Sequence, residues 1–151
     1  MPAFRLTRAL SVRAIACSIA LFSSAPAGAD GSVSALGMGM GARPGEMGHF
    51  DAVVSQYDAS GERFRIDGHC QSACTMFLSI HNVCIELDAM LLFHAGNNRS
   101  GQVSAASTNH MLATYKPALA KYLTDNHFMD TFEFHTISGN ELISRFGYPA
   151  C

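Results

Sequence analysis

The first 29 residues limit what the rest of the chain can fold into, because they have the three parts of a cleaved secretory signal peptide. Residues 14–22 are apolar or small throughout, which suits a signal peptide and is too short to span a bilayer. Small residues end the segment, in Ala27-Gly28-Ala29, as signal peptidase requires. The basic residues that precede the apolar run are Arg5, Arg8 and Arg13. We therefore expect a periplasmic or secreted protein that begins near Asp30.

A lipoprotein is the alternative interpretation of this leader, with Cys17 as the modified residue at the cleavage site. It is disfavoured because Arg13 lies only four residues before Cys17, which leaves almost no apolar run ahead of it.

The mature chain has about 120 residues, enough for one domain with a real core. Cleavage removes three arginines and no acidic residue, which leaves 7 Lys and Arg against 12 Asp and Glu, a net charge of −5. An acidic surface argues against a nucleic-acid partner. No later apolar run could span a membrane, and no motif indicates a cofactor. A peptide or protein partner and an oligomeric state both stay open.

Four cysteines remain after cleavage: Cys70, Cys74, Cys84 and Cys151. An even number in an exported domain favours disulfides, and four cysteines allow three pairings. A zinc site with His69 or His81 is the disfavoured alternative, because the Cys70–Cys74 spacing is not that of a zinc knuckle.

Residues 30–49 form a Gly/Met-rich segment without apolar periodicity, which predicts a flexible arm before a domain at 50–151. The arm carries a group of soft metal ligands, Met38, Met40, Met47 and His49. Thioethers suit Cu(I), so copper binding is a minor alternative.

The pattern of apolar residues predicts strands and helices in mixed order. Strands are expected at 50–57, 63–67, 83–86 and 89–94, and helices at 72–80, 104–126 with a kink at Pro117, 128–135 and 139–146. The last helix begins with the capping-box pattern Ser138-Gly139-Asn140-Glu141. This order is typical of an α/β domain with a small, mainly parallel sheet and strand–helix crossovers.

A right-handed crossover would place Cys70, at the end of one strand, beside Cys84 on a parallel neighbour. Adjacent strands lie about 5 Å apart, a distance that a disulfide can span. We therefore expect a Cys70–Cys84 disulfide, with Cys74 competing for the same partner.

Ser72 and His94 are the candidate catalytic residues. Ser72 falls between a strand and an apolar helix, where free N–H groups could stabilise an oxyanion. His94 ends an apolar strand and opens a polar loop, a suitable place for a general base. The alternatives are that Ser72 only caps its helix and that His94 is a structural, hydrogen-bonded histidine.

The region around residues 62–146 resembles the Clp protease proteolytic subunit and its crotonase-fold relatives, especially small periplasmic Clp-like proteins. In that family a serine starts a helix after a strand, and a histidine follows two short strands later; Ser72 and His94 match these positions. Later matching segments are Gly101-Gln102, residues 129–136 with their His-Thr turn, and Glu141-Leu142-Ile143. The resemblance implies a truncated crotonase-type fold and a serine nucleophile with a histidine base.

Two family features have no counterpart in this sequence. The family's catalytic aspartate lies beyond the His-Thr turn, where this chain has no matching residue, and no strand–turn–helix unit with a Gly-Gly turn is evident before Phe50. The acids nearest the matching later helix are Asp130, Glu133 and Glu141. The sequence therefore slightly favours a degenerate, non-catalytic relative stabilised by disulfides over an active serine peptidase or hydrolase.

Overall fold

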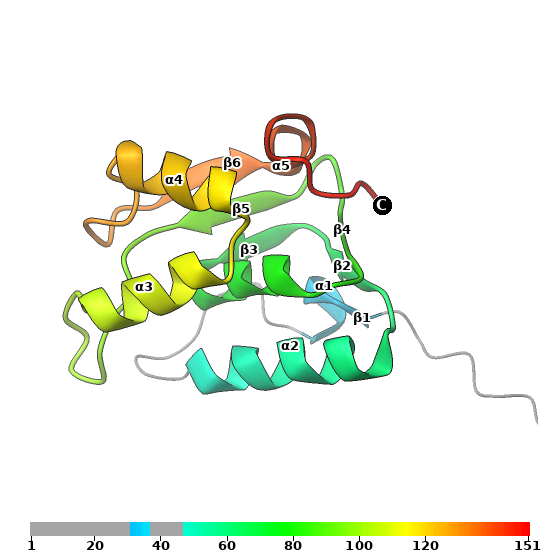
Figure 1. Cartoon of the computed structure of the whole chain (residues 1–151), viewed down its shortest axis with the longest axis horizontal. Coiled ribbons are helices and arrows are strands. Elements are labelled where there is room, and N and C mark those ends of the chain that lie inside the picture. Colours follow the sequence, from blue (N-terminus) through cyan, green and yellow to red (C-terminus); the bar gives the residue numbers. More distant parts are fainter. Residues whose placement is uncertain (1–30, 37–46) are drawn as a thin grey trace, which may run out of the picture.

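The computed structural model describes residues 31–36 and 47–151, so the signal peptide predicted at 1–29 lies outside the described residues. The elements follow one another in the order β1 (Gly31–Ser32), α1 (Val33–Leu36), α2 (Met47–Ser60), β2 (Phe64–Ile66), β3 (His69–Gln71), the 3₁₀ helix η1 (Ser72–Ser79), β4 (Val83–Ile85), β5 (Met90–Phe93), α3 (Ala105–Ala113), α4 (Pro117–Asp125), β6 (His135–Ser138) and α5 (Gly139–Phe146) (Figure 1).

The described strands form two three-stranded sheets, ordered β1-β2-β4 and β3-β5-β6. All pairings are parallel except that of β5 with β6. From β2 to β5 successive strands alternate between the sheets, since β2 and β4 belong to the first and β3 and β5 to the second. The expected α/β class and parallel character are confirmed, although a single sheet was expected.

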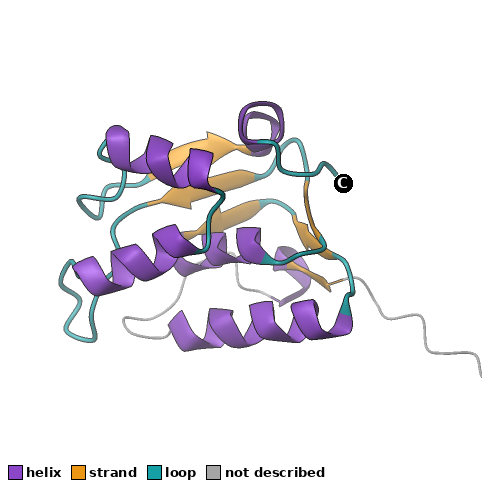
Figure 2. Cartoon of the chain, in the orientation of Figure 1, coloured by secondary structure: helices purple, strands orange, loops and turns teal. Residues whose placement is uncertain are grey.

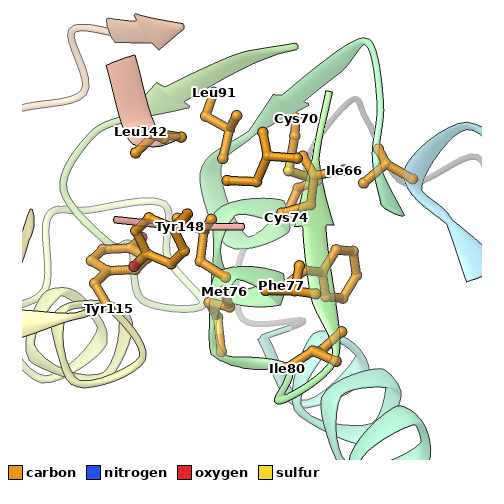
Figure 3. Packing of buried hydrophobic residues seen from close by; sticks show 14 of the residues in the cluster. Ile66, Cys70, Cys74, Met76, Phe77, Ile80, Leu91, Tyr115, Leu142 and Tyr148 are labelled. Carbon is orange, nitrogen blue, oxygen red and sulfur yellow. A yellow bond between two sulfur atoms is a disulfide. The ribbon is translucent and has the colours of Figure 1, made fainter. Parts of the chain in front are cut away.

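The 3₁₀ helix η1 is the centre of the domain. Its residues 73–78 are all buried, and it packs against α2, α3 and the strands β3, β4 and β5 (Figure 2). Around it the core is aromatic and aliphatic: Phe77 contacts both Phe50 and Phe64, with ring centroids 5.4 and 4.8 Å away, and Figure 3 shows the neighbouring side chains. Among the described residues, no helix has the length and apolar character needed to cross a membrane.

The strand predicted at 50–57 is wrong, because these residues lie in α2. Phe50, Val53 and Tyr57 are its buried residues, and their spacing of three and four places them on one helical face. Packing of this face against η1 outweighs the β-propensity of the adjacent valines.

The flexible arm predicted at 30–49 is wrong for the residues that the structure describes. β1 pairs in parallel with β2, α1 follows it, and α2 begins at Met47, so secondary structure does precede Phe50. Gly31 packs on Tyr57, and a Cβ at residue 31 would lie 1.9 Å from the tyrosine hydroxyl oxygen. Glycine is thus required here by close packing. Residues 37–46 lie outside the described part.

The helix predicted at 104–126 is divided into α3 and α4. Pro117 is the cause: it has no N–H to continue a helix, and it is well suited to the first turn of α4, where it lies. The helix predicted at 128–135 is absent, and β6 begins at His135. The last helix is confirmed as α5, with the Ser138 hydroxyl oxygen accepting a hydrogen bond from the Glu141 N–H.

The predicted Cys70–Cys84 disulfide is wrong. The disulfides are Cys70–Cys74 and Cys84–Cys151, so a bond within the 70/74/84 group does form but with a different partner. The physical reason is sheet membership: Cys70 lies on β3 beside β5, whereas Cys84 lies on β4 beside β2. The chain end reaches Cys84 because Cys151 N–H donates to the Ile85 carbonyl.

Candidate functional site

Ser72 and His94 follow two neighbouring parallel strands. β3 and β5 pair with Gln71 opposite Leu92; Ser72 comes directly after Gln71, and His94 comes two residues after Leu92. Because the carboxyl ends of parallel strands meet at one sheet edge, both candidate catalytic residues belong to the same edge. Open parallel sheets place their sites outside this edge.

Ser72 has a left-handed backbone conformation, with φ of 57°. Among the described residues, only His127 shares a positive φ without being glycine. A non-glycine residue held in this region costs about 1–3 kcal/mol, and such residues cluster at functional sites. The turn resembles the strained strand-to-helix elbows that expose a nucleophile.

Ser72 is not the cap of η1, so the alternative of a capping serine is wrong. The N-cap residue is Gln71, and no side-chain cap hydrogen bond is made there. Ser72 is the first residue of the 3₁₀ helix and is partly exposed. The first N–H groups of such a helix have no partner within it and can donate to a developing oxyanion.

The backbone at Ser72 is held from the core side by Thr75 and Tyr115. The Thr75 hydroxyl donates to the Ser72 carbonyl oxygen at 2.7 Å, and its oxygen lies 2.6 Å from the Tyr115 hydroxyl. Burial raises the pKa of Tyr115, so its phenol stays protonated and able to donate.

His94 is buried, with 7% of its surface exposed, and its Nδ1 has no hydrogen-bond partner among the described residues. Burial lowers the pKa of His94, and the backbone of Ala95 acts in the opposite direction. The ring is therefore neutral near pH 7 and able to accept a proton, as a general base must. A buried imidazole nitrogen without a partner also argues against a purely structural histidine.

Two exposed phenylalanines surround the His94 ring. Phe134 and Phe132 have ring centroids 4.8 and 5.9 Å from it, both edge-on, and are 47% and 41% exposed. Their segment is held at the end of β5 because Ala95 N–H donates to the Thr131 carbonyl oxygen at 2.8 Å. The site thus has an apolar, solvent-facing wall.

No carboxylate orients His94 through Nδ1 in the part of the chain that the structure describes. Of the three acids near the matching helix, Asp130 pairs with His127 and Glu141 pairs with Arg145, each at 2.8 Å. Glu133 is exposed, and its backbone N–H donates to the Thr131 hydroxyl oxygen. Among the described residues, Ser72 and His94 thus have no third member that would complete a Ser–His–Asp triad.

The metal-binding alternatives find little support. Cys70, Cys74 and Cys84 are all in disulfides, which removes the thiolates that zinc would need. The described residues contain no cluster of three or more His, Cys, Asp or Glu placed to hold a metal. In the predicted copper group, Met47 and His49 lie in the first turn of α2, whereas Met38 and Met40 lie outside the described residues.

A cavity of about 390 Å³ lies elsewhere, at the opposite end of η1 from Ser72. Its lining includes Leu78 and Ile80 from this end, Lys116, and Tyr148 near the chain end. The Lys116 ammonium donates to the Gly147 carbonyl and lies 4.5 Å from the Tyr148 ring centroid, so the one lysine of the lining already has partners. The cavity contains neither Ser72 nor His94 and is separate from the candidate site.

Four residues of this site were not expected from the sequence. The signal for Phe132 and Phe134 was their two-residue spacing, which places both side chains on one face of an extended segment. Thr75 and Tyr115 had no detectable signal, because their contact joins residues 40 positions apart. In comparisons with known proteins, no family model matches the chain, and neither a curated protein nor a solved structure does.

Proposed function

We propose that this chain is an exported Clp-like serine hydrolase domain in which Ser72 is the nucleophile and His94 the general base. The observation that carries the proposal is the left-handed backbone of Ser72. This residue follows β3, and His94 follows β5, the parallel neighbour of β3. The neutral imidazole of His94, whose Nδ1 has no hydrogen-bond partner among the described residues, supports it. The order of Ser72 and His94 along the chain is the order found in the Clp-like family that the sequence resembles.

In the proposed reaction, His94 takes the proton of the Ser72 hydroxyl as the Ser72 oxygen attacks the carbonyl carbon of an ester or peptide bond. N–H groups at the start of η1 donate to the oxyanion that forms. His94 then gives the proton to the leaving group, and a water molecule hydrolyses the acyl-serine with His94 again as the base. Since no carboxylate orients His94 Nδ1 among the described residues, the expected rate is modest.

The proposed substrates carry an apolar group beside the scissile carbonyl. Phe132 and Phe134 are the large apolar side chains beside His94, and their exposed faces could pack against an acyl chain or an apolar peptide side chain. Esters of longer acyl chains should therefore react faster than acetate esters.

The proposed location is the periplasm or the medium. Disulfides persist in oxidising compartments, and two are present among the described residues. Intact-mass measurement of the exported protein should give a chain that begins near Asp30 and has no free thiol. A protein that still begins at Met1 would contradict export by this signal.

The second candidate function is a non-catalytic binding domain of the same fold. The observation in its favour is that no carboxylate orients His94 Nδ1 among the described residues. Such a domain would keep the Ser72 turn without chemistry and would bind an apolar peptide or protein segment at Phe132 and Phe134.

A serine-directed fluorophosphonate probe separates the two candidates. We expect it to label the wild-type protein at Ser72, as mapped by peptide mass spectrometry, and not to label Ser72→Ala or His94→Gln. Ser79→Ala is the matched control, because Ser79 ends the same 3₁₀ helix and its hydroxyl only donates to the Met76 carbonyl. A folded wild-type protein that resists the probe and hydrolyses no ester would favour the binding domain.

A further inference from the structure

The Cys70–Cys74 disulfide encloses Ser72. Cys70 lies on β3, Cys74 lies one turn into η1, and their Cα atoms are 5.4 Å apart with Ser72 midway between them in the sequence (Figure 3). Both cysteines are fully buried, at 0% exposure. The bond therefore joins the end of the strand to the start of the helix across the turn that contains the strained serine.

This bond closes a short loop, so it acts on the unfolded chain less than the other disulfide does. The effect of a disulfide on the unfolded state grows with the loop that it closes, and Cys70 and Cys74 are four residues apart, against 67 for Cys84 and Cys151. Its effect in the folded state is local: it limits the backbone conformations open to residues 71–73.

We propose that Cys70 and Cys74 are positioning residues for the candidate site, and that their disulfide keeps Ser72 in its left-handed conformation. This inference rests on the proposed function. Without the bond, the Ser72 backbone would relax toward an ordinary helical or extended conformation, because the left-handed region is unfavourable for serine. The hydrogen bond from Thr75 to the Ser72 carbonyl supports the turn from the other side.

The loss of this restraint should lower the rate of the chemical step and leave substrate binding unchanged. A displacement of a reacting group by about 1 Å can cost roughly 10²-fold in rate. Phe132 and Phe134, which we assign to the binding of the substrate, belong to a different segment that is held by Ala95 and not by the disulfide.

The test compares two cysteine-pair variants of the mature protein. For Cys70→Ala/Cys74→Ala we expect kcat for a nitrophenyl ester, and the rate of fluorophosphonate labelling, to fall about 10²-fold with KM nearly unchanged. The matched control is Cys84→Ala/Cys151→Ala, which removes the other disulfide and should lower Tm while kcat stays at the wild-type value. An unchanged kcat in a folded Cys70→Ala/Cys74→Ala protein would overturn the proposal.

Reduction offers a second route that needs no change at residues 70 and 74. In the Cys84→Ala/Cys151→Ala protein, the only remaining pair is Cys70–Cys74, so treatment with a dithiol should lower the labelling rate and reoxidation should restore it. A labelling rate that stays the same after complete reduction, verified by thiol alkylation, would contradict the inference.

A backbone measurement makes the outcome independent of hydrolysis. The ¹³C chemical shifts of Ser72 should report a left-handed residue in the wild-type and Cys84→Ala/Cys151→Ala proteins, and an ordinary conformation in Cys70→Ala/Cys74→Ala. If the wild-type protein shows neither labelling nor hydrolysis, the proposed function fails, yet these shifts still decide whether the disulfide holds Ser72. Left-handed shifts in all three proteins would refute the positioning role.

Discussion

The hydroxyl oxygen of Tyr115 lies 2.6 Å from the hydroxyl oxygen of Thr75, inside the core. Thr75 donates its single hydroxyl proton to the Ser72 carbonyl oxygen, at 2.7 Å, so Tyr115 must be the donor to Thr75. A chain of two hydrogen bonds thus runs from the segment between α3 and α4 to the backbone of the candidate nucleophile.

Thr75→Val should destabilise the protein more than Tyr115→Phe. The valine leaves both the Ser72 carbonyl and the Tyr115 hydroxyl without a partner, at a cost of about 1–3 kcal/mol, whereas the phenylalanine removes one hydrogen bond worth about 1 kcal/mol. The double variant should lose less than the sum of the two, because one hydrogen bond is counted in both. Urea unfolding of the four proteins measures this; strict additivity would show that the two bonds are independent.

Ser72→Gly should be more stable than Ser72→Ala by about 1 kcal/mol, because glycine alone is free of the steric cost of the left-handed conformation. Both variants should lose fluorophosphonate labelling. Ser79 is the matched control: it lies in the same helix and, unlike Ser72, is not at a positive φ. There the order should reverse, with Ser79→Gly less stable than Ser79→Ala by roughly 1 kcal/mol. The same order at both positions would refute the strain assigned to Ser72.

The stability of the protein should depend on pH through His94. Burial places the folded-state pKa of His94 below its ordinary 6.5. Between these two values the unfolded state binds more protons than the folded state, so the free energy of unfolding rises with pH in this window. The contribution of His94 to stability is complete above the window and is lost as pH falls through the folded-state pKa.

His94→Gln should remove this pH-dependent part of the free energy of unfolding. Urea unfolding at intervals from about pH 4.5 to 7.5, a range that includes the ordinary histidine pKa of ~6.5, measures the change. Phe134→Ala exposes the ring and should narrow this window from its low-pH side, because desolvation is the largest cause of the lowered folded-state pKa. His49→Gln, the same substitution at an exposed position of α2, is the matched control with which these profiles are compared. An identical profile in His94→Gln would contradict the assignment.

The two disulfides should contribute unequally to global stability. From the loops that they close, removal of Cys84–Cys151 should cost about 4 kcal/mol and removal of Cys70–Cys74 about 2 kcal/mol. Guanidinium unfolding of the two cysteine-pair variants measures the difference. The reverse order would mean that the short disulfide supports the folded core as a whole and does more than restrain one turn.

The local parts of the fold could be predicted because they depend on neighbouring residues. The α5 cap follows from Ser138 and Glu141, which lie three residues apart, and the strand β2 follows from alternation of buried Phe64 and Ile66 with exposed Arg65. Short-range signals also placed Ser72 at a strand-to-helix turn and His94 at a strand end. An even number of cysteines indicated that all four would pair, and they do.

Only the tertiary structure decided which strands are neighbours, and the disulfide prediction failed for that reason. Local sequence cannot show that β3 joins β5 while β4 joins β2, since strand pairing is selected by the burial of side chains far apart in the chain. The same holds for α2, whose valines favour a strand until Phe50 and Tyr57 pack against η1 and β2. Sequence therefore determined the residue types at the candidate site and their order, and long-range packing decided that the carboxyl ends of β3 and β5 meet, that Cys74 closes the turn around Ser72, and that His94 is buried.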